Sequence, residues 1–303
     1  MKFTIHNPLD EGWYADPEAR YYDGKYYIYV THSLPRYSQQ LNHTCFVSED
    51  LTHWEKVENI IDMSGFPWAK AAVWAPTIEE KNGKYYYIFA TNDIPHESDV
   101  GGLEIAVSDS PTGPFKAMLK HPLVGQFHNG AQPIDAHLFK DDDGTMYLYY
   151  GGWGHCNICK MNEAMTGFIP FEDGEVFKEI TPPDYVEGPC MLKRGEKYYF
   201  MWSAGGWTNG TYRVNTCIAD KPWGPFTEAS TILSTGDSTI ATGPGHNGFL
   251  YLPEDDQYLM VYHRHKPHIQ DGNARFLCID RMDLDKEGNI LPVVMTEGWE
   301  YNT

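Results

Sequence analysis

The sequence lacks the long apolar runs of a membrane protein and the basic excess of a nucleic-acid-binding protein. Its apolar runs are no longer than a strand, and its 303 residues carry 42 acidic against 23 basic side chains, a formal net charge of −19. A field of that sign repels phosphate backbones and suits a neutral ligand. We therefore expect neither a nucleic-acid partner nor a membrane partner, and the sequence sets no oligomeric state.

The N-terminus also lacks a secretory signal, and the cysteines lack a metal-binding pattern. Residues 1–13 contain no apolar core of the about 7–15 residues that a signal peptide needs. The one close pair, Cys156-x-x-Cys159, has no second CxxC or histidine pair beside it. Since residues i and i+3 of a strand face opposite ways, we interpret the cysteines as small buried apolar residues. Free thiols suit a reducing compartment, so we expect a cytoplasmic protein.

The sequence does contain one pattern that repeats five times. Each repeat has a segment with Pro or Gly, a strand-like stretch, a Gly or Asp turn and an aromatic strand. Each repeat opens at an anchor position, and the anchors are 59, 60, 52 and 59 residues apart. Four anchors precede the turn glycine of their hairpin (Gly24, Gly83, Gly144 and Gly195) by 8, 8, 9 and 8 residues, so we expect them at the same height on the innermost strands. A period of about 40–60 residues with several short strands in each unit is typical of a β-propeller. The anchors are Asp16, Ala75, Asp135, Glu187 and His246.

A third strand, an acidic turn and an outer strand follow each aromatic strand, as in the matching fragments SPTGPF and KPWGPF. The sequence therefore predicts an all-β fold, a five-bladed β-propeller with four antiparallel strands in each blade. Five units fill residues 1–303 as a single domain, with approximate blades at 8–68, 69–126, 127–180, 181–235 and 236–303. The variable stretches 32–43, 92–101, 153–157, 204–214 and 264–274 return to the anchor end, where we expect a substrate-binding rim.

Fivefold symmetry would bring Asp16, Asp135 and Glu187 to one end of one channel. Carboxylates that share a narrow channel cannot all ionise freely, so their pKa values separate. Glycoside hydrolysis needs such a separated acid and base, because one group protonates the leaving oxygen while the other activates water or attacks the anomeric carbon. The alternative is that they cap loops or bind a structural cation. The anchor of blade 2 is Ala75, so the fold does not require a carboxylate at the anchor position. This favours the catalytic interpretation.

The anchor motifs are similar to those of glycoside hydrolase family 43, with one motif in each blade and in the same order. The resemblance covers the whole chain and implies a five-bladed propeller enzyme that inverts the anomeric centre in a single displacement. It implies that Asp16 is the general base, Glu187 the general acid, and Asp135 the carboxylate that tunes the pKa of the acid. The motifs are Ala15-Asp16-Pro17, Trp74-Ala75-Pro76, Ile134-Asp135-Ala136, Glu187-Gly188-Pro189 and Gly243-Pro244-Gly245-His246-Asn247.

The resemblance also implies roles for His246 and Arg275. His246 matches a channel histidine that, in some relatives, orients water or coordinates calcium or another divalent cation, although the chemistry requires no cofactor. Arg275 matches an arginine that reaches the substrate from the fifth blade. Other histidines (His137, His263, His265 and His268) alternate faces along strands, which favours core or solvated roles over a metal cluster. The aromatic candidates for stacking on a sugar are Trp13, Trp74, Phe127, Trp153 and Trp207.

We therefore expect an exo-acting glycosidase that hydrolyses α-L-arabinofuranosides, β-D-xylosides or both in oligosaccharides derived from hemicellulose. One alternative is an endo-acting arabinanase with an open groove. The other is a non-catalytic carbohydrate-binding propeller, against which the intact acid, base and modulator positions argue.

Overall fold

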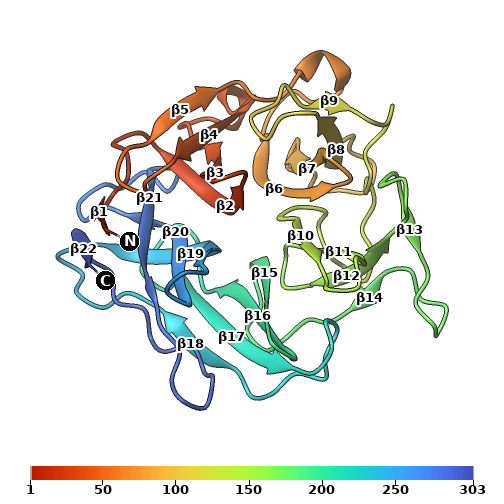
Figure 1. Cartoon of the computed structure of the whole chain (residues 1–303). Helices are drawn as coiled ribbons and strands as arrows, with labels where there is room; N and C mark the ends of the chain where they lie inside the picture. The colour runs from red at the N-terminus through yellow and green to blue at the C-terminus, as the bar shows by residue number, and fades with distance from the viewer. Residues whose placement is uncertain (1, 303) are drawn as a thin grey trace.

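The chain folds into five antiparallel sheets arranged around one axis (Figure 1), which confirms the predicted five-bladed β-propeller. The computed structural model describes residues 2–302. Within that part of the chain the helices are two 3-10 turns, η1 (Tyr37–Gln39) and η2 (Met63–Gly65). No helix of residues 2–302 is long and apolar enough to cross a membrane.

Three blades have the predicted four strands, and in each the chain runs outward through successive hairpins from an innermost first strand (Figure 1). Their strands are, for blade 1, β2 (Tyr14–Tyr22), β3 (Lys25–His32), β4 (His43–Ser48) and β5 (Glu55–Glu58); for blade 2, β6 (Trp74–Lys81), β7 (Lys84–Thr91), β8 (Gly102–Ser108) and β9 (Lys116–Ala117); and for blade 4, β15 (Glu187–Arg194), β16 (Lys197–Ala204), β17 (Arg213–Ala219) and β18 (Ser230–Leu233).

Blade 3 departs from the predicted count because its outermost strand is split. A turn at residues 171–175 interrupts the outer segment, so two short strands pair with different halves of the third strand. The sheet therefore has five strands: β10 (His137–Lys140), β11 (Met146–Tyr150), β12 (Asn157–Met161), β13 (Phe168–Ile169) and β14 (Lys178–Glu179).

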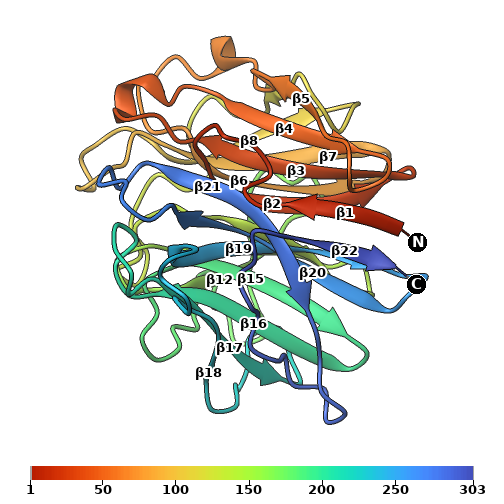
Figure 2. The same cartoon turned by 90° about the vertical axis from the view of Figure 1, so that its left-hand side faces the viewer.

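Blade 5 has a three-stranded sheet, β19 (Thr242–Leu252), β20 (Gln257–His265) and β21 (Arg275–Met282). On the outer edge of β21, the Asn7 side chain forms the backbone hydrogen bonds that a fourth strand would otherwise form. Its side chain donates to the Ile279 carbonyl at 3.0 Å and accepts from the Ile279 amide at 2.9 Å. The neighbouring β1 (Lys2–His6) pairs with β22 (Gly298–Asn302), so the two chain ends meet at this blade and close the ring (Figure 2).

Five apolar clusters hold the ring together, and each combines facing sides of two adjacent blades. Tyr29 of blade 1 meets Tyr87 of blade 2 with ring centroids 5.7 Å apart, and Tyr149 of blade 3 meets Phe200 of blade 4 at 5.7 Å. Full burial of one such side chain stabilises the fold by about 1.5–3 kcal/mol. All six cysteines are buried and unpaired, as predicted for small core residues. This packing between blades fixes where the innermost strands stand around the axis.

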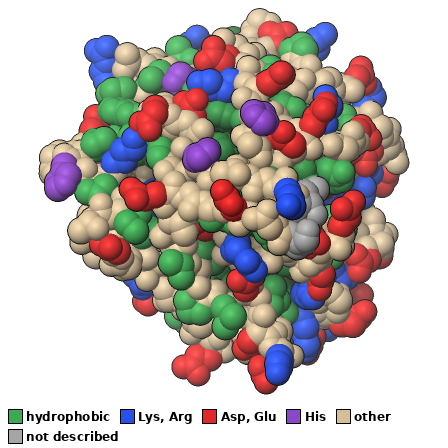
Figure 3. Space-filling view, turned by 60° about the vertical axis from the view of Figure 1, so that its left-hand side comes forward, with side chains coloured by type: hydrophobic (Ala, Val, Ile, Leu, Met, Phe, Trp, Pro, Cys, Tyr) green, Lys and Arg blue, Asp and Glu red, His purple; other side chains and the backbone are tan. Residues whose placement is uncertain are grey.

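The acidic side chains of one face of the molecule are spread out rather than gathered. On the face shown in Figure 3, acidic side chains alternate with basic and apolar ones. Two groups of buried charge lie at opposite ends of the central channel. One contains Asp16 and Arg275, and the other contains Glu18 and Arg20.

Candidate active site

The innermost strands are kinked near their starts. The register of β2 against β3 shifts between Ala15 and Glu18, and β6, β15 and β19 shift at matching places. Such bulges bend a strand and re-aim a side chain. In each of these bulges, and just before β10 in blade 3, a residue has a left-handed φ, an uncommon conformation that persists only where its surroundings hold it. These residues are Asp16 (53°), Ala75 (44°), Asp135 (55°), Gly188 (63°) and His246 (45°).

Glu187 is therefore not at the anchor position that counting along the sequence gave it. The left-handed residue of blade 4 is Gly188, and Glu187 lies one residue earlier, where blade 2 has Trp74 and blade 3 has Ile134. Its carboxylate thus approaches the axis from a different strand position than those of Asp16 and Asp135.

The turn glycines explain this error. Gly24 and Gly83 are the second residues of their two-residue loops, which join Tyr22 to Lys25 and Lys81 to Lys84. Gly195 is instead the first residue of the loop between Arg194 and Lys197. Counting back from the glycine therefore displaced blade 4 by one residue.

Asp16, Asp135 and Glu187 line one cavity of about 310 Å³ at the anchor end of the channel. Of the other candidates, His246, Arg275, Trp74, Trp153 and Trp207 share this lining. Trp13 and Phe127 are not among its lining residues in the described chain. Trp13 precedes β2 and accepts the Ser33 amide through its carbonyl, and Phe127 packs edge-on against Trp153 with ring centroids 5.2 Å apart. The remaining lining residues are Tyr37, Asp93, Gln132, Ile134, Val186 and Asn273.

Asp16 is held as an ion by its neighbours. The Arg275 guanidinium donates to Oδ1 at 2.7 Å, and that guanidinium lies over the Trp207 ring at 5.2 Å. The backbone amide of Asp16 donates to His263 Nδ1 at 3.1 Å. His263 is buried, as predicted for a core histidine, and this hydrogen bond holds the backbone of Asp16 in place. Burial raises the pKa of Asp16, but Arg275, His246 and the Thr31 side chain together outweigh burial, and the pKa lies below its usual value.

Glu187 and Asp135 have the opposite electrostatic environment. Burial and the charge of Asp16 raise the pKa of Glu187, although the Tyr212 hydroxyl donates to its Oε1 at 2.8 Å. Burial, Glu187 and Asp16 raise the pKa of Asp135 well above its usual range, while the Gly188 amide donates to its Oδ2 at 3.1 Å. Because the two carboxyls interact, they titrate as a pair. The pair holds a proton at pH values at which isolated carboxyls have lost theirs.

His246 lies between the two aspartates. Its Nδ1 is 3.4 Å from Asp16 Oδ1 and 3.5 Å from Asp135 Oδ2, and burial lowers its pKa. Within residues 2–302 no group of three or more His, Cys, Asp or Glu side chains is arranged to hold a metal ion. His246 therefore belongs to no such group, and the positive charge beside Asp16 is supplied by Arg275.

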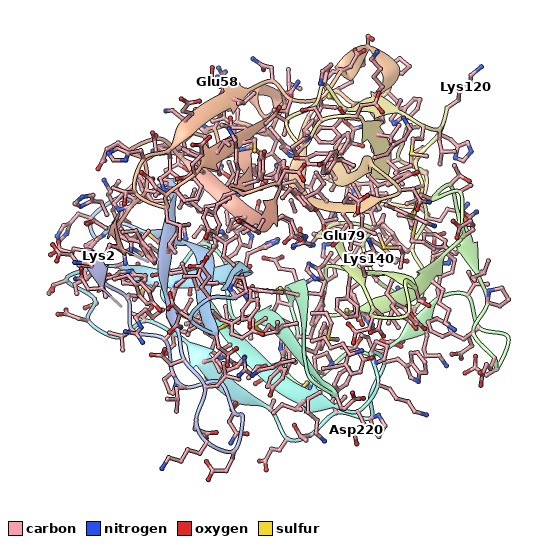
Figure 4. The ribbon with its side chains drawn as sticks, viewed as in Figure 1. Lys2, Glu58, Glu79, Lys120, Lys140 and Asp220 are labelled. Carbon is pink, nitrogen blue, oxygen red and sulfur yellow. The ribbon has the colours of Figure 1, made fainter. Side chains whose placement is uncertain are left out.

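A second, larger cavity of about 880 Å³ lies further along the same innermost strands, at the opposite end of the channel. Its lining includes Arg20, Glu79, His137 and Lys140. Glu79 and Lys140 are labelled in Figure 4 on the inner side of the ring, whereas Glu58, Lys120 and Asp220 are peripheral. Arg20 contacts both Glu18 and Glu79, so the charges at this end are already paired within the protein.

The sequence did not single out several residues of the catalytic end. Tyr37, Asp93, Tyr212 and Asn273 lie in variable stretches that were predicted to form the rim, so their positions carried a signal although their identities did not. Gln132 lies outside these stretches, and nothing in its local sequence indicates its place in the cavity.

Comparison with known proteins agrees with this geometry. The family profile described as "Glycosyl hydrolases family 43" matches residues 5–290. The chain is 39% identical to a β-D-galactofuranosidase, xynD, of Aspergillus niger, over 98% of this chain and 87% of that protein. It is 27% identical to a β-xylosidase of Xylanibacter ruminicola, over 97% and 100% of the two chains.

Solved structures share the fold over nearly the whole chain. An α-L-arabinofuranosidase from Clostridium thermocellum is similar with a TM-score of 0.74 and 27% identity, over 94% of this chain and 95% of that one. A thermostable family-43 glycoside hydrolase is similar with a TM-score of 0.79 and 25% identity, over 96% of each chain. Because the family profile spans almost all of the five blades that build the carboxylate cavity, this chain belongs to glycosyl hydrolase family 43 and is a glycoside hydrolase.

Proposed function

We propose that this chain is an inverting, exo-acting glycosidase that removes α-L-arabinofuranosyl or β-D-xylosyl residues from the ends of hemicellulose-derived oligosaccharides. Asp16 is the general base, Glu187 the general acid, and Asp135 the carboxylate that keeps the pKa of the acid high. One observation carries this proposal: Asp16 and Glu187 line the same cavity, and their pKa values are shifted in opposite directions.

The proposed reaction is a single displacement. Asp16 takes a proton from a water molecule as that water attacks the anomeric carbon, while Glu187 gives its proton to the leaving oxygen. Arg275 keeps Asp16 ionised before the attack. The Tyr212 hydroxyl stabilises the Glu187 carboxylate that remains after proton transfer. Solvent then removes the proton from Asp16 and returns one to Glu187.

The size of the cavity supports removal of end residues. About 310 Å³ is near the lower limit of ligand pockets, which hold roughly 300–1,000 Å³, so it suits one terminal sugar and part of the next. The endo-acting alternative is represented among relatives by an extracellular endo-α-(1→5)-L-arabinanase 2 of Bacillus subtilis, at 27% identity. Arabinan digestion separates the two: monosaccharides support the exo mode and oligosaccharides the endo mode.

The similarity to a galactofuranosidase favours a second candidate substrate. β-D-galactofuranosides share the ring configuration of α-L-arabinofuranosides and differ by an extended exocyclic chain. A panel of nitrophenyl α-L-arabinofuranoside, β-D-xyloside and β-D-galactofuranoside, each with and without a chelator, therefore identifies the preferred sugar. Turnover of one furanoside or xyloside supports the proposal, and turnover of none contradicts it.

The acid role of Glu187 has its own test. Glu187→Ala should reduce hydrolysis of an oligosaccharide by about 10²- to 10⁴-fold and hydrolysis of the nitrophenyl glycoside much less, because nitrophenolate leaves without a proton. Equal losses on both substrates would contradict the assignment. Proton NMR of the first-formed anomer should show inversion, and retention would overturn the single displacement.

A further inference from the structure

The catalytic cavity contains a fourth carboxylate, Asp93, which the proposed reaction does not use. Blade 2 is the blade whose anchor, Ala75, carries no polar side chain, yet it supplies Asp93 from the loop that follows β7. An acid, a base and a modulator already account for the chemistry. The presence of Asp93 therefore needs another explanation.

The loop is built to hold Asp93 in place. Asn92 and Asp93 both have left-handed backbones, with φ of 70° and 44°, and such a conformation costs free energy that the surroundings must offset. The Asn92 side chain braces the loop with four hydrogen bonds of 2.6–3.2 Å to backbone groups of Trp68, Lys70, Ala71 and Val100.

One oxygen of Asp93 is fixed and the other is free. Gln132, from the start of blade 3, donates through Nε2 to Asp93 Oδ1 at 3.0 Å and to the Ile94 carbonyl at 3.1 Å. Oδ2 has no hydrogen-bond partner within residues 2–302. Gln132 thus orients a carboxylate whose second oxygen is available to a ligand in the cavity.

Asp93 lies on the acid side and near the mouth of the cavity. Asp16 and Asp135 are 5% and 6% exposed at its base, whereas Asp93 is only partly buried and shares the lining with Trp153, which is 52% exposed. The negative charge of Asp93 acts on Glu187 and contributes to the raised pKa of that acid. Because Asp93 and Glu187 line the same cavity and Asp93 lies nearer its exposed rim, a leaving group that extends from Glu187 toward that rim can contact Asp93.

We propose that Asp93 binds a hydroxyl group of the sugar residue on the leaving-group side, through Oδ2, and so selects oligosaccharides over glycosides whose leaving group has no hydroxyl. This inference rests on the proposed function, because the acid Glu187 defines the leaving-group side. An ionised carboxylate only accepts hydrogen bonds, sugar hydroxyls donate them, and bonds to a charged acceptor are the stronger kind.

The test compares two substrates with the same terminal sugar: a disaccharide (arabinobiose or xylobiose) and the corresponding nitrophenyl glycoside. Asp93→Asn removes the charge and Asp93→Gly removes the side chain, and both residues tolerate the left-handed backbone. We expect kcat/KM for the disaccharide to fall roughly 10- to 100-fold, mainly through KM, since one hydrogen bond to a charged group is lost. The loss on the nitrophenyl glycoside should be much smaller, because its leaving group offers no hydroxyl to Asp93.

Glu97→Gln is the matched control, because Glu97 is an exposed carboxylate of the same loop and does not line the cavity. It should leave both substrates unaffected. Equal losses on both substrates in the Asp93 variants would overturn the inference. So would a shift of the basic limb of the pH profile to lower pH without a preferential loss on the disaccharide, because Asp93 would then act only through the pKa of Glu187.

A failure of the proposed function gives a different result. If the wild type hydrolyses neither substrate, the function is wrong, and calorimetry of disaccharide binding then decides the inference. A loss of affinity in Asp93→Asn but not in Glu97→Gln supports disaccharide binding by Asp93. Equal affinities in the two variants would refute it.

Discussion

The two ends of the central channel use similar residues to opposite effect. Asp16 and Glu18 are two residues apart on β2, and both are buried carboxylates. Asp16 opens into the smaller cavity with Glu187, while Glu18 lies among charged groups toward the larger cavity. The larger cavity is lined by none of Asp16, Asp135 and Glu187, so cavity volume alone does not locate the proposed chemistry.

The difference lies in the number of partners. Glu18 pairs with Arg20, lies 2.9 Å from His137 Nδ1 and accepts the Thr77 hydroxyl at 2.9 Å. Burial raises its pKa, but Arg20 and the other partners outweigh burial and lower the pKa to about 2. Glu187 accepts from the Tyr212 hydroxyl, and its pKa is raised. Glu18 is thus held ionised by several partners, whereas Glu187 is buried with one hydroxyl donor and its raised pKa suits it to hold and release a proton.

The largest expected effect is in the cavity that Asp16 and Glu187 line. Asp16→Asn removes the proposed base, so kcat should fall about 10²- to 10⁴-fold while the protein stays folded. Steady-state kinetics on the preferred nitrophenyl glycoside, with a thermal melt of the same sample, measure both quantities. Turnover near that of the wild type would remove the base assignment and with it the functional contrast between the two ends.

The next largest effect concerns stability, at the end of the channel where Glu18 pairs with Arg20. Glu18→Gln leaves Arg20 without its main counter-charge, and the free energy of unfolding at neutral pH should fall by about 3 kcal/mol, as a pKa lowered from 4.5 to about 2 implies. The folded fraction should keep its activity. Glu49→Gln is the control: it removes an exposed partner of Lys25 and should change the free energy of unfolding by less than about 1 kcal/mol.

The pH dependence of that loss has a definite sign. The pKa of Glu18 is lower in the folded chain than in the unfolded chain, so its contribution is complete above pH 4.5 and is lost as the pH falls toward about 2. Urea unfolding of the wild type and Glu18→Gln between these pH values should show the gap between them closing. A gap that is independent of pH would mean that the ion pair is not its source.

The parts of this design that repeat along the chain were predictable from the sequence. Blade number and strand order follow from the period, and the positions of Asp16 and Asp135 follow from their distances of 8 and 9 residues to a turn glycine. The same reasoning failed by one residue at Glu187, because Gly195 takes the first rather than the second place of its loop. A count from a turn is only as good as the assumed geometry of that turn.

The parts that depend on contacts between blades were not predictable. Asn7 completes blade 5 by bonding Ile279 from the other end of the chain, and Gln132 orients Asp93 across a blade boundary. Neither residue belongs to a periodic segment, so no local pattern indicates its partner. The contact of Glu18 with His137 likewise appears only when blades 1 and 3 are brought together.

The smallest expected effect compares the two ends through a single hydroxyl at each. Tyr212→Phe removes the donor to Glu187, and Thr77→Val removes the donor to Glu18. Because a donor favours the ionised form, Tyr212→Phe should raise the pKa of Glu187 and move the basic limb of the pH–rate profile upward by at most about one unit. Thr77→Val should lower the melting temperature and leave that profile in place, because Glu18 remains paired with Arg20 and takes no part in proton transfer. Equal shifts of the profile in both variants would show that the two ends form one titrating network, and the division between structural and reactive carboxylates would then be wrong.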